Sequence, residues 1–455
     1  MSTFAPENNK LMTRHLLASI LGTTMSLTAL ASTVPTPADT AFTRFRVGGY
    51  GEMLAQFKDY GLNRFSGVPT GNMKVNHNEI SIPRFVLAGD YKITSRWILG
   101  AEIEIESGGT GQALEIEKGS GSENGEYELE QEKGGEVALE QFHLTRLVVP
   151  EFNVRIGHMV IPVGLTNAHH EPINFFTAAR PEGATTLMPS TWHMTGVEFF
   201  GSFGRGMASF DYEAMVTAGL NPNGFNAYNW VRDGKQGLFE TDNFSAPAYT
   251  ARLNWTGVPG LRVGASIFYN PDAGRNADKL ITYKGIGDIN VLLYSFDIQY
   301  INKYVCARGN FLSGNITNTE ALTSQNRSGL GMNHPYSTPR PGTLIARRAV
   351  DWSAEVGLNL KSLFPRMEKF PRLYPFVHYN YYNPQESVAG SGTPEKRCQV
   401  SLWSFGLNWR ILPGLVAKAD YTTRQIGTAK VFGTSGYHSE NEFRLALAYT
   451  LWFTK

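Results

Sequence analysis

The sequence predicts an all-β chain that folds as a transmembrane antiparallel β-barrel, with sixteen strands by our count. Three observations lead to this fold class: apolar residues recur at every second position in many segments, the connections between these segments alternate in length, and an export signal begins the chain. The alternation is clearest near the C-terminus, at Phe443, Leu445, Leu447, Tyr449, Leu451 and Phe453. A period of two indicates a strand with one apolar face, and about 9–11 residues of tilted strand cross a bilayer.

The N-terminal residues have the pattern of a secretory signal peptide. A basic lead-in precedes an apolar and small-residue run from Leu16 to Leu30, and a cleavage site of the A-x-A type ends at Ala31. The sequence leaves open whether Met1 or Met12 is the start. The expected parts of the chain are therefore a signal peptide, a short leader and the barrel, at residues 1–31, 32–44 and 45–455.

Composition agrees with a membrane barrel. Aromatic residues make up 12% of the chain, the mean hydropathy is −0.24, and no apolar run after the signal is long enough for a transmembrane helix. Cleavage after Ala31 leaves 41−2 = 39 basic and 40−1 = 39 acidic residues, so we expect no nucleic acid as a partner. Cys306 and Cys398 are too few for disulfides to carry the fold, and the sequence does not say whether they pair.

Each expected strand is a stretch of alternation, and the connections are short and long in turn. Short turns with Pro and Gly and long loops with Gly, Asn, Ser and charge are typical of barrels with periplasmic turns and external loops. An even count lets the first strand pair with the last, although fourteen or eighteen strands stay open as alternatives. The strands are expected near residues 45–57, 79–91, 97–105, 137–148, 153–161, 195–203, 207–219, 248–256, 261–269, 290–301, 304–312, 349–361, 373–382, 399–410, 415–426 and 443–453.

Alternation alone does not say which face of the strands meets lipid, because a soluble β-sandwich would turn its apolar face inward. The export signal, the chain length and the loop asymmetry favour an apolar face that points outward. Aromatic residues near strand ends are then expected at the two membrane interfaces. The candidates for these girdles are Trp97, Trp255, Trp409 and Trp452.

If the apolar face meets lipid, the polar face encloses a lumen, and about 16–18 strands leave room for an aqueous channel. A charge in lipid would cost about 2–4 kcal/mol at mid-depth, whereas charges in a water-filled pore cost little and can select ions. The alternative is a plugged or collapsed lumen in which these charges pair. The residues expected to line the lumen are Arg46, Glu52, Arg96, Glu102, Glu104, Arg155, Asp211, Glu213, Arg252, Arg262, Asp297, Arg308, Asp351, Glu355, Arg410, Lys418, Asp420, Arg424 and Arg444.

The connection near 162–192 differs from the other long ones because it is less acidic and more apolar. Its Ile173, Phe175, Phe176, Leu187 and Met188 are poorly suited to open solvent, so we expect this third external loop to fold inward and narrow the channel. The residues expected at the resulting constriction are His169, His170, Glu171 and Arg180.

Several motifs resemble the phosphate-selective porin O/P family. They are R-I-G-H-M-V-I-P-V-G-L-T-N from Arg155 to Asn167, Arg180-Pro181, and P-S-T-W-x-x-x-G from Pro189 to Gly196. The segments G-G-Y-G-E (Gly48 to Glu52) and E-I-E-I-E (Glu102 to Glu106) are similar as well. The resemblance implies a trimeric porin of the Gram-negative outer membrane whose third loop enters the pore.

The same resemblance implies a ladder of arginines that binds phosphate. This chain departs from that pattern, because its expected lumen charges are balanced and Arg180 is the obvious basic residue of the loop. We therefore expect passive diffusion of small hydrophilic solutes or ions, with anions such as phosphate among them.

Other classes of protein have less support. No nucleophile stands out beside His143, His158, His193 or His378, so we expect no enzyme. His169-His170-Glu171 would chelate a metal only on a curled loop, because neighbours on an extended chain point to opposite sides; no metal and no cofactor are expected. The short leader leaves no room for the plug domain of an energised receptor.

The serious alternative is a non-conducting barrel, an adhesin, receptor or assembly partner that works through long loops near 107–135 and 313–347. The first of these loops is rich in glutamate, which predicts a solvated, flexible segment. The expected partners are outer-membrane lipid and lipopolysaccharide, two further copies of the chain in a homotrimer, and the barrel-assembly machinery through the C-terminal strand.

Overall fold

The structure is a computed structural model of the whole chain. It describes residues 42, 44–61, 76–109, 135–236, 241–277, 282–330, 344–367, 369–428, 430–431, 434–435 and 440–454. The expected signal peptide, most of the leader and most of the acidic loop near 107–135 lie outside the described residues.

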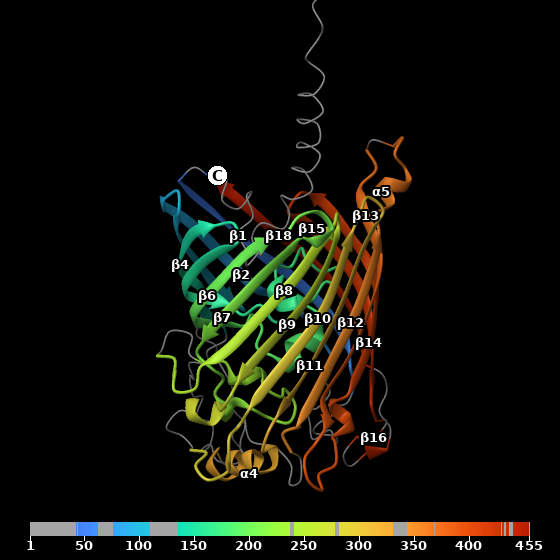
Figure 1. Cartoon of the computed structure of the whole chain (residues 1–455). Coiled ribbons are helices and arrows are strands. Elements are labelled where there is room, and N and C mark those ends of the chain that lie inside the picture. Colours follow the sequence, from blue (N-terminus) through green and yellow to red (C-terminus); the bar gives the residue numbers. More distant parts are fainter. Residues whose placement is uncertain are drawn as a thin grey trace, which may run out of the picture.

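Sixteen strands form one closed barrel, in which every strand pairs antiparallel with its neighbours in chain order and β1 closes on β18 (Figure 1). Two further strands of two residues each, β16 (Lys430–Val431) and β17 (Thr434–Ser435), pair only with each other. The barrel strands are β1 (Phe45–Asp59), β2 (His77–Thr94), β3 (Trp97–Glu106), β4 (Glu136–Val149), β5 (Phe152–Val160), β6 (His193–Phe203), β7 (Phe210–Thr217), β8 (Ala248–Val258), β9 (Leu261–Asn270), β10 (Val291–Ile301), β11 (Val305–Ile316), β12 (Arg348–Leu358), β13 (Arg372–Ser387), β14 (Val400–Leu412), β15 (Leu415–Ile426) and β18 (Glu440–Thr454).

The predicted fold class and strand count are confirmed. The seam pairs β1 with β18 from Val47 opposite Thr454 to Asp59 opposite Asn441, so the sheet has no open edge. The short connections lie at the end of the barrel that carries the C-terminus, and the long ones lie at the opposite end (Figure 1). In the turn between β14 and β15, Gly414 has φ +116° and a side chain there would meet Thr450 O, which explains the glycine.

The helices are short and lie in the connections. They are α2 (Leu165–Ala168), α3 (Glu182–Leu187), α4 (Thr319–Leu330) and α5 (Leu360–Leu363), with 3₁₀ turns η1 (Gly206–Ala208), η2 (Pro222–Gly224), η3 (Arg232–Gly234), η4 (Ala273–Asn276) and η5 (Lys396–Cys398). Within the described part of the chain, no helix has the length and apolar character needed to cross a membrane.

The apolar face of the strands points out of the barrel and the ionisable face points in. On β18, Leu447 is 43% exposed and Leu451 is 41% exposed on the outer face. Arg444, which lies on the inner face of the same strand, is 7% exposed. Trp97 and Trp409 lie on the outer face, as the girdle prediction requires. The prediction is wrong for Trp452, whose ring lies on the inner side with the Arg46 guanidinium carbon 3.9 Å from its centroid.

A large buried apolar cluster fills part of the external half of the barrel. It joins the inner face of several strands to the connections, for example through Trp192 and Phe268, whose ring centroids are 4.6 Å apart. Trp230 is fully buried and donates from its indole nitrogen to Ala346 O at 3.0 Å. Leu322 of α4 belongs to the same cluster, so the external connections pack as a folded cap on this side of the barrel.

Candidate functional site: the segment inside the barrel

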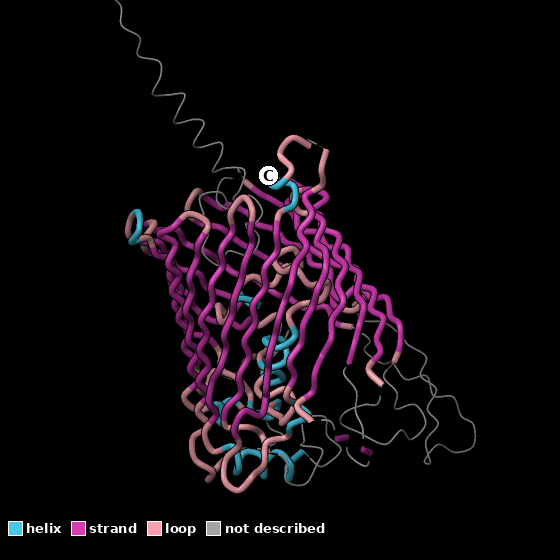
Figure 2. Tube along the Cα trace, turned by 90° about the vertical axis from the view of Figure 1, so that its right-hand side faces the viewer, coloured by secondary structure: helices cyan, strands magenta, loops and turns pink. Residues whose placement is uncertain are grey.

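Residues 161–192, between β5 and β6, run inside the barrel (Figure 2). We call these residues the inner segment. Its apolar side chains, including Phe176 and Leu187, are almost completely buried, which supplies the physical reason for the position: outside the barrel they would meet water.

The two ends of the inner segment are held together by Asn167. Its amide nitrogen donates to Ile161 O at 2.7 Å, and its amide oxygen accepts from Trp192 N at 2.7 Å. Gly164, with φ +72°, turns the chain so that its N–H meets Ser295 Oγ at 3.0 Å. The entry of the inner segment is therefore fixed by backbone geometry and by neutral hydrogen bonds to the wall.

On one side, the inner segment contacts a cluster on β1, β2 and β4. His170 Nε2 lies 3.0 Å from Glu140 Oε1, and Tyr50 donates to the other carboxylate oxygen of Glu140 at 2.8 Å. Arg84 donates to His170 O at 2.6 Å. All four side chains are less than 5% exposed, so this contact is dry and specific.

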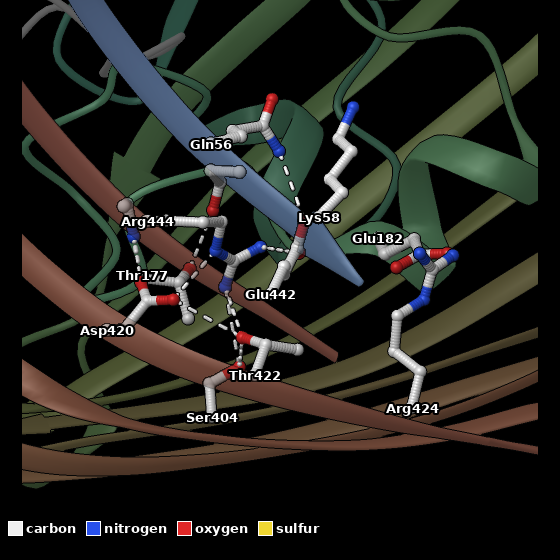
Figure 3. A network of polar contacts seen from close by, with 12 residues as sticks. Gln56, Lys58, Thr177, Glu182, Ser404, Asp420, Thr422, Arg424, Glu442 and Arg444 are labelled. Atoms are coloured by element: carbon white, nitrogen blue, oxygen red, sulfur yellow. Dashed lines mark hydrogen bonds and ion pairs between the residues drawn. The ribbon is translucent and has the colours of Figure 1, made fainter. Parts of the chain in front are cut away.

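Two strands beyond β1 in the barrel order, β15 holds the inner segment by its backbone. Lys418 donates to Phe175 O at 3.0 Å and to Thr177 O at 2.9 Å, and Asp420 accepts from Ala178 N at 2.5 Å. Asp420 is in turn bound by Arg444 at 2.7 Å, which continues the network along β18 and β14 (Figure 3).

The helix α3 is held on the side of β12, β13 and β15. Glu182 accepts from Arg424 and from Tyr382, and Gly183 N donates to Asn380 Oδ1 at 2.7 Å. A side chain at Gly183 would collide with Asp351, so only glycine lets the backbone approach the wall this closely. Counting all such bonds, the inner segment is attached to β2, β4 and β9–β15.

The four residues expected at the constriction all belong to the inner segment, but they have different surroundings. His170 is paired with Glu140, and Glu171 accepts from its neighbour Asn174 at 2.7 Å. His169 lies against Arg262 of β9. Arg180 donates to Ser190 Oγ and, at 3.2 Å, to Thr191 Oγ1, and no carboxylate among the described residues lies within ion-pair distance of it.

The residues expected to line the lumen lie on the inner face of their strands with one exception. Arg96 is exposed in the turn between β2 and β3, so its expected position is wrong. β2 ends at Thr94 and β3 begins only at Trp97, so Arg96 belongs to neither strand. The others are Arg46, Glu52, Glu102, Glu104, Arg155, Asp211, Glu213, Arg252, Arg262, Asp297, Arg308, Asp351, Glu355, Arg410, Lys418, Asp420, Arg424 and Arg444.

Most of these arginines are neutralised by carboxylates on neighbouring strands. Arg155 lies 2.7 Å from Glu198, Arg252 lies 2.8 Å from Asp297 and Arg308 lies 2.8 Å from Glu355. Arg424 and Arg444 are paired in the same way. The described cations without a carboxylate within 4.0 Å are few on this wall, and they are Arg180, Arg262, Arg410 and Lys418.

A cavity of about 30 Å³ lies between the inner segment and β10–β13. His169, Arg308, Glu355 and His378 are among the residues that line it. That volume holds about two water molecules.

Sequence reasoning missed Arg84 and Glu140. The pairing of β3 with β4 shifts between Glu102 and Ile103, and a second shift on β1 between Glu52 and Leu54 changes its pairing with β2. Because a bulge interrupts the period of two, alternation no longer assigns these residues to a face. A charged residue in an apolar run, as at Arg84, was the remaining signal.

Among the residues that the structure describes, no three His, Cys, Asp or Glu side chains lie close enough together to hold a metal ion. Cys306 and Cys398 are both buried, and no disulfide joins them. The expectation that the chain is not an enzyme stays a prediction.

Comparisons with known proteins agree on the fold. No family model matches the chain. An uncharacterized protein of Aquifex aeolicus is 25% identical over 386 residues, which cover 82% of this chain and 74% of the relative. OmpF of Salmonella typhi, in a complex with daunomycin, superposes with a TM-score of 0.52 at 11% identity over 90% of this chain and 97% of its own. OprB of Pseudomonas putida gives 0.50 at 9% identity, over 91% and 95%.

These similarities and the geometry define the class: the chain has the sixteen-stranded barrel of outer-membrane porins. Its apolar outer face is that of a barrel that spans a membrane, as the expected location in the outer membrane of Gram-negative bacteria requires. These comparisons do not test the resemblance to the phosphate-selective porin family, which stays a prediction.

Proposed function

We propose that the protein is a porin that lets small hydrophilic solutes and ions diffuse through the outer membrane, at a rate set by the inner segment. The observation that carries this proposal is the contrast between the apolar outer wall and an inner wall of ionisable groups around a segment held by hydrogen bonds. Such bonds to charged groups are worth about 1.5–3 kcal/mol each. They can be exchanged for water, so the segment can shift without unfolding the barrel.

We expect weak ion selectivity. The four cations without a carboxylate partner, named above, face seven carboxylates without an ion-pair partner in the described barrel: Glu102, Glu106, Glu136, Glu171, Asp211, Glu213 and Asp351. Phosphate selection would need a ladder of free arginines. The arginine–carboxylate ion pairs inside the barrel argue against such a ladder. Anions such as phosphate would pass as small solutes without a dedicated site.

A non-conducting barrel is the second candidate, because the inner segment is bonded to most of the wall and the apolar cluster closes part of the external half. Its working surface would be the external cap. Planar-bilayer recording of the purified protein separates the two functions. Current steps at low voltage support the porin. A protein that gives no current, but whose heat-modifiable gel mobility shows that it is folded, supports the second candidate.

The expected partners remain proposals. A homotrimer would be tested by mass of the protein in detergent or nanodiscs. Contact with lipopolysaccharide through the acidic loop near 107–135 predicts looser association after removal of divalent cations. Recognition of the terminal strand by the assembly machinery predicts poor insertion after truncation before Phe453.

A further inference from the structure

The connection between β12 and β13 is unlike the other connections at the C-terminal end of the barrel. The others have at most six residues, whereas residues 359–371 include α5 and stand out from the rim (Figure 1). We call residues 359–371 the α5 turn. Leu363, Phe364 and Met367 are 54%, 46% and 56% exposed there, so a folded element presents three large apolar side chains at the periplasmic rim.

The α5 turn is a fixed element. Asn359 N donates to Tyr304 O at 2.7 Å, and Ser362 Oγ donates to Lys303 O at 2.6 Å, which ties the turn to its neighbour between β10 and β11. The rings of Phe364 and Phe370 lie 5.1 Å apart. The exposed apolar groups are therefore held in place and do not collapse onto the barrel.

The α5 turn and the first residue of β13 also carry net positive charge. Arg366, Lys369 and Arg372 are exposed, and Lys361 braces the turn by donating to Phe370 O at 3.0 Å. With Glu368, which lies outside the described residues, residues 359–372 have a sequence charge of 4−1 = +3. Cations beside apolar side chains form the pattern of an interfacial membrane anchor.

The lipid-facing surface continues to the base of the α5 turn. Leu358, the last residue of β12, is 47% exposed, and on the adjoining hairpin Trp409 and Leu412 are 45% and 60% exposed. Apolar surface thus runs from the lipid belt to Leu363 and Phe364, with cations at the level of the headgroups.

We propose that the α5 turn binds anionic phospholipids of the periplasmic leaflet, with Phe364, Leu363 and Met367 against the acyl chains and Arg366, Lys369 and Arg372 at the phosphate groups. Charge complementarity selects the lipid headgroup, and the continuous apolar surface selects a bilayer over a soluble partner. The turn would then fix the rotational setting of the barrel in the membrane and gather anionic lipid beside β12–β14.

The test uses a spin label on Phe364→Cys in the full chain with Cys306→Ser and Cys398→Ser, reconstituted in phosphatidylcholine vesicles with and without phosphatidylglycerol. We expect oxygen to reach the label better than a water-soluble nickel chelate, and the ratio to rise with phosphatidylglycerol. The triple variant Arg366→Gln, Lys369→Gln, Arg372→Gln should lose most of that rise.

The matched control removes three exposed cations from other turns at the same rim, Arg96→Gln, Arg205→Gln and Lys303→Gln, and should keep the rise. A label that the nickel chelate reaches as freely as in water, with either lipid, would place the α5 turn in the periplasm and overturn the proposal. Low access of both reagents would indicate a protein partner and would overturn it as well.

Discussion

Lys418 of β15 holds Phe175 of the inner segment in two ways. Its ammonium group donates to the backbone oxygen of Phe175 at 3.0 Å and lies 4.0 Å from the centroid of the Phe175 ring. With its further bonds to the backbone oxygens of Pro172 and Thr177, this one side chain anchors the middle of the inner segment to the wall.

Replacing Lys418 by methionine keeps the volume but removes these bonds. The free energy that holds the inner segment should fall by about 1.5–3 kcal/mol, so the displaced state should become roughly ten times more populated or more. Single-channel recording should show larger or longer openings, and vesicle swelling should show faster entry of small sugars. Lys303→Met, in an exposed turn, is the control. Equal conductance in both variants would mean that the inner segment does not limit flow.

The contact of Glu182 with Arg424 should be energetically coupled. Glu182→Gln and Arg424→Gln are each expected to speed amide hydrogen exchange in residues 161–192, and the double variant should cost less than the sum because both act on one contact. Exchange followed by mass spectrometry measures this. The same cycle at Glu395 and Arg397, an ion pair of an external connection, should leave the exchange unchanged. Additive effects at Glu182 and Arg424 would contradict the structure.

Arg180 contributes a positive charge to the inner segment that no described carboxylate neutralises. The Arg180→Ala variant should therefore shift the reversal potential in a salt gradient toward cation preference, by a modest amount because most of the other arginines inside the barrel are paired with carboxylates. Arg205→Ala, exposed in a turn, should behave as the wild type. If the reversal potential of Arg180→Ala does not move, Arg180 does not border the path of the ions.

The outward position of Leu447 on β18 predicts that the cost of a charge on the lipid-facing surface depends on depth. Leu447→Arg places a charge in lipid near mid-depth and should lower the free energy of unfolding by about 2–4 kcal/mol, whereas Leu412→Arg near the rim should cost about 0–1 kcal/mol. Urea titration of the protein refolded in vesicles measures both. Similar losses at the two positions would argue against a lipid-facing Leu447.

The strands could be predicted because alternation and turn residues are local signals. The face of the strand to which Leu447 and Arg444 belong follows from their own side chains, since successive residues of a strand face opposite sides. The apolar character of Phe176 and Leu187 indicated an inner position in the same local way. The partners of the inner segment could not be predicted, because Lys418 is more than two hundred residues from Phe175 in the chain.

The external cluster escaped prediction for a different reason. At the external ends of β9 and β10 both faces are apolar: Phe268 and Leu293 are fully buried inside, while Ile267 is 45% exposed on the outside. A period of two cannot distinguish the sides where both are apolar, and it cannot reveal that Trp192 and Trp230 come from other connections to fill the space between them.

That cluster gives the barrel a thermodynamic signature of its own. Outward side chains such as Ile267 face lipid in the inserted barrel, so they do not meet water when the external half melts. Trp230 and Phe268 instead leave water when the connections pack against each other, as in a globular enzyme. Heat uptake on melting the external half should therefore grow with temperature as it does for water-soluble domains, and the cap should melt as a cooperative unit of its own while the hydrogen-bonded wall persists.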